Sequence, residues 1–185
     1  MMQRLFNPFR YIAGSKALIM GYLFIVASAL MLYSGNLIQD SYIHIGMAEA
    51  SFLEVLGAQT IWWIVPAVLL YLCGMALSKS KIRIIDILGT TAFAQIVLLL
   101  MIAPMLLPSV QQSTTEFVAA MQSGTIPTTI PIPLTISGIW STIGLILFYI
   151  WNYNAFSVSC NVRGWKAVAL FITVQVAVTI VGTLI

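Results

Sequence analysis

Charged side chains are scarce in this sequence. Asp, Glu, Lys and Arg make up 7% of its 185 residues, whereas apolar residues make up 61%. A soluble domain carries about 25% charged residues. So few charges leave too little polar surface to cover a water-soluble globule, but a lipid bilayer accepts an apolar exterior. The composition therefore predicts an integral membrane protein with membrane lipids around it. The net charge of +3 is too small and too scattered for a nucleic-acid surface, so we expect no nucleic-acid partner.

Histidine and cysteine, the usual metal and redox residues, are almost absent. Cys73 and Cys160 are far apart and show no metal or redox spacing. His44 is the single histidine; it follows Asp40 by four residues, a spacing that matches no zinc motif. There is also no glycine-rich phosphate loop. The sequence therefore predicts a protein that is not an enzyme and has no cofactor and no metal site. An intramembrane metalloenzyme with its metal at Asp40 and His44 is kept as one alternative function.

Long apolar runs are abundant. Five stretches approach the roughly 20 residues that a helix needs to cross about 30 Å of hydrocarbon. The fold class that they predict is an all-α membrane protein: one domain, residues 1–185, built as a bundle of five transmembrane helices. The expected spans are Ala17–Gly35, Leu56–Leu77, Ile87–Leu107, Leu134–Ile150 and Ala167–Ile185.

The connections between these spans predict the orientation. Successive connections lie on alternate sides of the membrane, so the residues before the first, third and fifth spans share one side. All eight basic residues lie there: Arg4, Arg10, Lys16, Lys79, Lys81, Arg83, Arg163 and Lys166. Four of the five acidic residues fall on the other side, and Asp86 alone stays with the basic residues. Short loops rich in Lys and Arg remain cytoplasmic. We therefore expect the N-terminus inside and the C-terminus outside.

Two outer loops, residues 36–55 and 108–133, are long enough to hold structure. The first mixes apolar and polar residues and is expected to lie in the membrane interface as a short amphipathic segment, with Tyr42 near the boundary. Ser51 and Glu54 have capping-box spacing and predict the start of the second membrane helix. Ser113 and Glu116 repeat that spacing, which predicts a short helix through about Met121. Three prolines, Pro127, Pro131 and Pro133, then predict an extended path into the fourth span.

Polar side chains within the spans are the candidates for function. An ionisable residue inside the membrane is a usual sign of transport or catalysis, and none lies at the centre of a span. Asp86 comes closest, at the start of the third span. It is interpreted as a helix N-terminal carboxylate beside Arg83, with a proton or cation site as the alternative. Gln95 and Gln175 both lie near mid-span, where they either bond across helices or line a polar groove.

Small residues recur at helical spacing and predict close helix packing. Ala17 and Gly21 are four residues apart, as are Ser137 and Ser141, and Gly138 lies beside Ser137. Such pairs let backbones approach, either within the bundle or at an interface with another protein.

Several local strings resemble the Yip1 family in its short form, without the long cytoplasmic N-terminal region of eukaryotic members. The strings are Asn7-Pro8-Phe9-Arg10, the segment from Ser78 to Gly89, Ala92-Phe93-Ala94-Gln95, Trp140, and the basic loop from Asn161 to Ala167. The resemblance implies five spans with the N-terminus inside and the C-terminus outside. Eukaryotic relatives bind Rab GTPases in membrane traffic, but the expected topology leaves little cytoplasmic surface for a GTPase, so we do not expect that activity here. The family has no catalytic residues to carry across.

Two functions remain open at this point. The first is a non-enzymatic membrane-organising or accessory interaction subunit, which forms a homo-oligomer or binds other membrane proteins, in a bacterial cytoplasmic membrane. The alternative is a component of a transporter or channel for an ion, a small molecule or a lipid, with a groove lined by Asp86, Gln95 and Gln175. An odd number of spans and the lack of an internal repeat disfavour the alternative.

Overall fold

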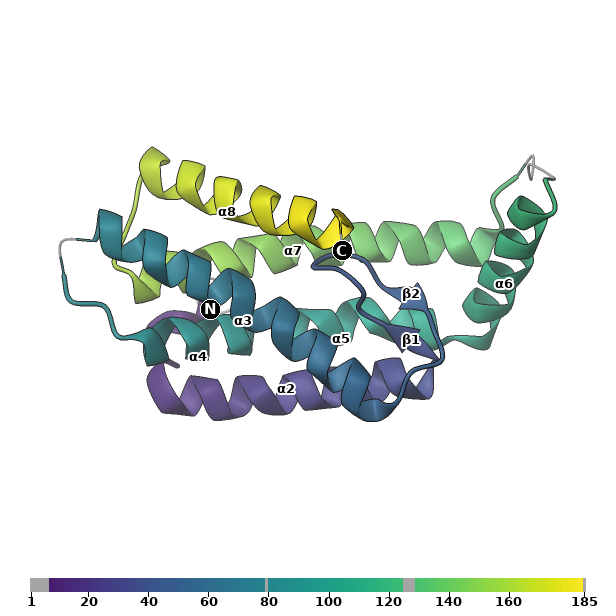
Figure 1. Cartoon of the computed structure of the whole chain (residues 1–185), viewed down its shortest axis with the longest axis horizontal. Coiled ribbons are helices and arrows are strands. Elements are labelled where there is room, and N and C mark those ends of the chain that lie inside the picture. Colours follow the sequence, from purple (N-terminus) through teal and green to yellow (C-terminus); the bar gives the residue numbers. More distant parts are fainter. Residues whose placement is uncertain (1–6, 79, 125–128, 185) are drawn as a thin grey trace.

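The computed structural model describes residues 7–78, 80–124 and 129–184, and it is almost entirely helical (Figure 1). Arg4, Lys79, Pro127 and Ile185, which entered the predictions above, lie outside the described residues. The elements in chain order are η1 (Pro8–Arg10), α2 (Gly14–Ser34), β1 (Leu37–Ile38), β2 (Gly46–Met47), α3 (Phe52–Leu77), α4 (Ile84–Ala94), α5 (Ile96–Ile102), η2 (Ala103–Leu106), α6 (Pro108–Gln122), α7 (Ile132–Ser159) and α8 (Trp165–Leu184).

Within the described residues, five helical segments are long and apolar enough to cross a membrane, which agrees with the predicted number. They are Gly14–Ser34, Phe52–Leu77, Ile84–Leu106, Ile132–Ser159 and Trp165–Leu184. Each one overlaps a predicted span, although the fourth is longer than predicted at both ends. The third span is made of α4, α5 and η2, and its regular helix is interrupted at Gln95 and again near Pro104.

The predicted start of the second membrane helix is confirmed. The Ser51 side chain accepts a bond from the Glu54 main-chain N–H, and the Glu54 carboxylate accepts from the Ser51 main-chain N–H at 2.7 Å. The helix predicted from Ser113 and Glu116 is present and ends at Gln122, close to the predicted Met121, but its predicted start is wrong. That helix, α6, already begins at Pro108, because proline is favoured in the first turn, where its missing N–H costs nothing.

Residues 35–51, which connect α2 to α3, differ most from expectation. They do not form an amphipathic segment in the interface. The two short strands β1 and β2 pair antiparallel, and the chain between them runs back along the bundle to the C-terminal end of α8 (Figure 1). A Cβ atom added to Gly182 of α8 would lie 3.1 Å from the Cβ of Ser41. We call residues 39–43 the re-entrant segment.

Gln39, Ser41 and Tyr42 of the re-entrant segment are buried, whereas Asp40 and Ile43 are exposed. Tyr42, expected at the boundary, is 2% exposed and packs its ring 5.9 Å from that of Phe148 in α7. The Gln39 amide donates to the Tyr42 carbonyl at 2.9 Å. Non-helical backbone at membrane depth requires such internal partners, because lipid offers none.

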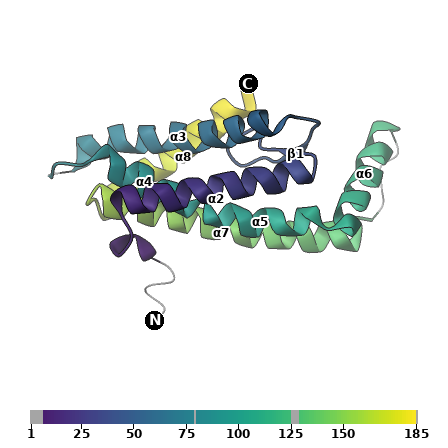
Figure 2. The ribbon, with the colours of Figure 1, turned by 90° about the horizontal axis from the view of Figure 1, so that it is seen from below.

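The two ends of the bundle differ in charge. At the basic end α2, α4 and α8 begin, and Arg10, Lys16, Lys81, Arg83, Arg163 and Lys166 lie there. At the opposite, acidic end lie residues 35–51, the start of α3, and α6, with Asp40, Glu49, Glu54 and Glu116. Both views show α6 running across the bundle instead of along it (Figures 1 and 2). This direction suits a helix that lies on a membrane surface.

Candidate functional site

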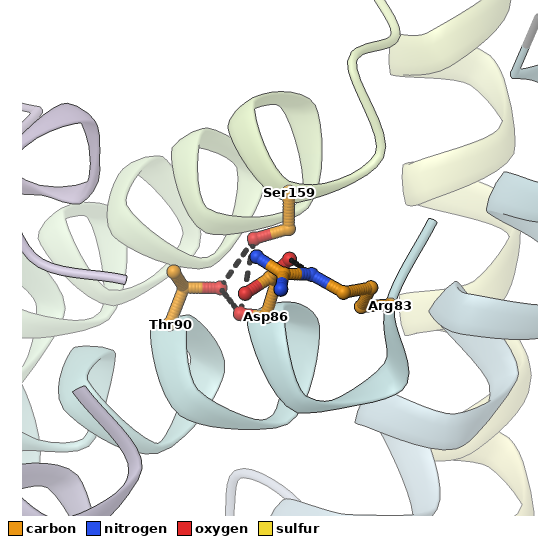
Figure 3. A network of polar contacts seen from close by, with 4 residues as sticks. All are labelled: Arg83, Asp86, Thr90 and Ser159. Carbon is orange, nitrogen blue, oxygen red and sulfur yellow. Dashed lines mark hydrogen bonds and ion pairs between the residues drawn. The ribbon is translucent and has the colours of Figure 1, made fainter. Parts of the chain in front are cut away.

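Asp86 lies at the basic end in a small network of polar contacts (Figure 3). It is the third residue of α4, and its carboxylate accepts a bond from the Arg83 side chain at 3.1 Å. Its main-chain carbonyl lies within hydrogen-bonding distance of the Thr90 and Ser159 hydroxyls, at 2.8 and 3.2 Å. Those two hydroxyls are 2.7 Å apart, so the network joins the start of α4 to the end of α7.

The surroundings of the Asp86 carboxylate favour a structural role. A Cβ atom at Gly14, the first residue of α2, would lie 3.3 Å from a carboxylate oxygen of Asp86. The carboxylate therefore stands beside the N-terminal ends of two helices, α2 and α4, where the helix dipoles favour negative charge. Arg83 itself is largely exposed, with 78% of its side chain accessible, so the ion pair contributes little.

The structure gives Gln95 and Gln175 different neighbours. The Gln95 amide donates to the Thr91 carbonyl one turn earlier, at 3.4 Å, where α4 gives way to α5. Gln175, on α8, lies next to the hydroxyl of Tyr42 in the re-entrant segment. Of the three polar candidates, Asp86 thus lies at the basic end, Gln95 beside its own helix backbone, and Gln175 beside the re-entrant segment.

The four small-residue candidates fall into two groups. Gly21 lies against the backbone of α4, since an added Cβ would overlap the peptide between Ala92 and Phe93. Gly138 has open space around the position of a Cβ, with nothing within 4 Å. Ser137 and Ser141 flank that space on α7.

This space is part of a cavity at the acidic end of the bundle, which we call the acidic-end cavity. It holds about 600 Å³, which is within the range of pockets that bind small molecules. Its walls come from the residues around β2, from α6 and from the first part of α7, and include His44, Gln111, Thr114, Ser137, Gly138 and Ser141. The Ser141 hydroxyl oxygen is buried there without a hydrogen-bond partner. Most of the remaining wall is apolar.

His44 and Asp40 are joined by a side-chain hydrogen bond at the rim of the acidic-end cavity. The His44 Nδ1 atom is 2.7 Å from the Asp40 carboxylate, and both side chains are more than half exposed to solvent. In the described part of the chain, no three His, Cys, Asp or Glu residues come together as a metal site would require. The pair is therefore a solvated surface contact of the kind that contributes little to stability.

The most exposed membrane helix is α7. Within its most apolar stretch 17% of the residues are buried inside the chain, against 61% for the span Ile84–Leu106. Six of its isoleucines are exposed at alternating spacings of four and three residues; they are Ile132, Ile136, Ile139, Ile143, Ile146 and Ile150. This spacing keeps them on one face of the helix. We call this face the isoleucine row.

The isoleucine row and the re-entrant segment are not among the features predicted above from the sequence. The row has a readable signal, because six isoleucines at a period of 3.5 residues are visible in the sequence itself. The re-entrant segment has a weaker one: Gln39, Asp40 and Ser41 form a short polar run between apolar residues. No family model matches this chain, and neither does any curated protein or any solved structure.

Proposed function

We propose that this protein is a non-enzymatic membrane-organising subunit of the Yip1 type, which binds another transmembrane helix through the isoleucine row of α7. The row carries the proposal. The other spans turn more of their surface into the bundle, whereas α7 presents a regular apolar face from Ile132 to Ile150. The proposed setting is a bacterial cytoplasmic membrane, with the N-terminus and the basic end inside.

The regularity of the row supports a protein partner over lipid alone. Lipid chains accept any apolar side chain, so contact with lipid does not require one residue type at one spacing. Isoleucine is β-branched and has few rotamers in a helix, so it loses little side-chain entropy when it packs. Spacing of four and three residues also matches the geometry by which two helices interdigitate. The partner helix is a second copy of this chain or a helix of another membrane protein.

Cysteine crosslinking in native membranes tests this proposal. In a chain whose Cys73 and Cys160 are replaced by alanine, Ile139→Cys is treated with a thiol-specific crosslinker. Leu23→Cys is the matched control, because Leu23 on α2 is 61% exposed and Ile139 is 60% exposed. We expect Ile139→Cys to give one discrete crosslinked band and Leu23→Cys to give none. Equal crosslinking at both positions, or none at either, would contradict the proposal.

The acidic-end cavity supports a second candidate, a component that transports or handles a small molecule or lipid. Its volume and its unpartnered Ser141 hydroxyl are the observations in favour. Gly138→Leu would reduce the volume of the cavity, and its Cβ would meet no neighbour, because nothing lies within 4 Å of that position. If the cavity carries transport, flux in liposomes falls with Gly138→Leu and is unchanged with Gly57→Leu, where a Cβ on α3 also meets no neighbouring atom.

A further inference from the structure

A second hollow, distinct from the acidic-end cavity, lies between α7 and α8 and is closed on one side by the re-entrant segment. We call it the α7–α8 groove. It holds about 400 Å³, and its wall is almost entirely apolar. The lining residues are Ile43, Tyr149, Phe171, Ile172, Gln175, Val176, Thr179 and Ile180. Ile172, Val176 and Ile180 are each about half exposed, so the groove opens toward lipid.

Gln175 is the anomaly in this groove. Its side chain is 4% exposed, and neither its amide nitrogen nor its amide oxygen makes a hydrogen bond of good geometry. The Tyr42 hydroxyl lies beside the amide, but one glutamine has two donor hydrogens and an oxygen that accepts two bonds. Most of its hydrogen-bonding capacity is therefore unused. Buried polar groups without partners are rare and each calls for an explanation.

Position along the helix limits what would satisfy this amide. Gln175 is the eleventh of the twenty residues of α8, so it lies about 15 Å from either end of the helix. That depth is the middle of a hydrocarbon layer about 30 Å thick. The polar groups of a phospholipid lie at the surface of this layer and do not reach the amide. A neutral lipid dissolved in the hydrocarbon can lie at this depth.

The other groove residues specify the chemistry further. Tyr149 and Phe171 present aromatic rings to the groove, and rings pack well against a flat conjugated ligand. The Tyr149 hydroxyl lies beside Thr179, so hydroxyl groups accompany the Gln175 amide. We propose that the α7–α8 groove binds a prenyl quinone, whose ring carbonyl accepts a hydrogen bond from Gln175 while its apolar tail follows the open side of the groove. This site does not depend on the isoleucine row.

The proposal makes an unusual prediction about Gln175→Leu. If the amide only held helices together, its removal would destabilise the protein. If it awaits a ligand, leucine removes an amide with most of its hydrogen-bonding capacity unused, which offsets the loss of a polar neighbour for the Tyr42 hydroxyl, so the ligand-free protein stays close to wild type in stability. The same change weakens quinone binding about tenfold, because one hydrogen bond is lost. Ile172→Trp fills the groove and abolishes binding by another route.

The experiment is native mass spectrometry and thermal unfolding of the full chain in nanodiscs, with a ubiquinone analogue of two prenyl units as the probe. Gln122→Leu is the matched control, since Gln122 is an exposed glutamine at the end of α6. We expect saturable binding of one probe to wild type and to Gln122→Leu. Binding is weaker for Gln175→Leu and absent for Ile172→Trp, and ligand-free Gln175→Leu keeps its unfolding temperature.

Several outcomes overturn the proposal. Equal affinity of wild type and Gln175→Leu shows that the amide does not contact the quinone. Binding of farnesol or phospholipid in place of the quinone assigns the groove to a different lipid class. A Gln175→Leu protein that unfolds at a clearly lower temperature without ligand makes the glutamine a structural residue. Absence of binding to wild type also rules the site out.

Discussion

Gly21 of α2 lies directly against the peptide that joins Ala92 to Phe93 in α4, so close that a Cβ atom would overlap it. About one turn of α4 nearer the basic end, Gly89 lies in the same way against the main chain of Gly14 in α2. The two backbones therefore touch at two levels, and each level uses a glycine. In a membrane, where apolar burial contributes little, such close van der Waals contact is a main source of helix association.

The first prediction concerns Gly21→Ala. The new methyl group meets main-chain atoms, which cannot turn away as a side chain does, so α2 and α4 must separate. We expect a loss of about 1–3 kcal/mol in the free energy of unfolding, the usual cost of overpacking. Gly57→Ala on α3 is the matched control, because nothing lies within 4 Å of its Cβ and alanine favours a helix. The free energies of unfolding of both variants are measured in detergent with increasing SDS. Equal stability of the two variants would show that the contact between α2 and α4 is loose.

The second prediction concerns Asp86→Asn. Asparagine keeps the shape of the side chain but loses the charge that faces the start of α2 and α4. We expect a loss of about 0.3–1 kcal/mol in the free energy of unfolding, typical of one charge at a helix end. Arg83→Gln should cost less, because that side chain is exposed to solvent. Thermal unfolding at low and high salt checks both. A larger loss for Arg83→Gln than for Asp86→Asn would contradict this interpretation.

A further readout separates a helix-end carboxylate from a proton or cation site. If Asp86 only stabilises the basic end, liposome flux for any ion is the same in wild type and in Asp86→Asn. A selective loss of proton or cation flux in the variant would instead make Asp86 part of a transport path.

The membrane helices could be predicted from the sequence because their signal is composition and length, which lipid imposes directly. The helix cap at Ser51 and Glu54 could be predicted too, since a capping box is a local pattern of four residues. For Gly21, the sequence showed only its four-residue spacing from Ala17, which predicts close packing against some helix. Which helix it faces depends on how α2 and α4 pack, and nothing near Gly21 in the sequence encodes that choice.

The burial of the re-entrant segment could not be predicted from neighbouring residues in the sequence. Tyr42 is amphipathic, and the sequence places it near a membrane boundary, where tyrosine is common. The structure buries it beside Phe148 of α7 and Gln175 of α8 instead. Burial of such a segment depends on partners that are more than 100 residues away in the chain.

The third prediction tests the re-entrant segment through Gln39. Gln39→Leu removes the donor to the buried Tyr42 carbonyl and leaves that carbonyl without a partner at membrane depth. We expect a loss of about 1–3 kcal/mol in the free energy of unfolding, and faster hydrogen exchange in residues 39–43. Gln112→Leu is the control, because the Gln112 amide makes an exposed bond to Glu116 on the surface of α6. Equal exchange in the two variants would mean that the segment does not need this bond.

The fourth prediction tests the proposed orientation. Glu49→Cys and Arg163→Cys place exposed thiols at the acidic and basic ends of the bundle, in a chain without its natural cysteines. A reagent that cannot cross the membrane should label Glu49→Cys in intact cells, and should label Arg163→Cys only after the cells are opened. The reverse pattern would place the N-terminus outside.

The last prediction concerns the thiol of Cys160, which ends α7 at the basic end. Cys160 is fully buried, and an added Cβ at Gly74 of α3 would overlap its sulfur atom. Burial in this apolar contact raises the pKa of the Cys160 thiol to about 12. At pH 8 the reactive thiolate is then about one molecule in ten thousand, since each unit of pKa above the pH lowers its fraction about tenfold.

Maleimide labelling checks this prediction in a chain that carries Cys73→Ala. The folded protein should resist N-ethylmaleimide at pH 8 for hours and react at once after unfolding in SDS. Arg163→Cys, in a chain that also carries Cys160→Ala, is the matched control, because it puts an exposed thiol three residues further along at the same end of the bundle. Fast labelling of folded Cys160 would mean that α3 and α7 separate at this end on the time scale of the reaction.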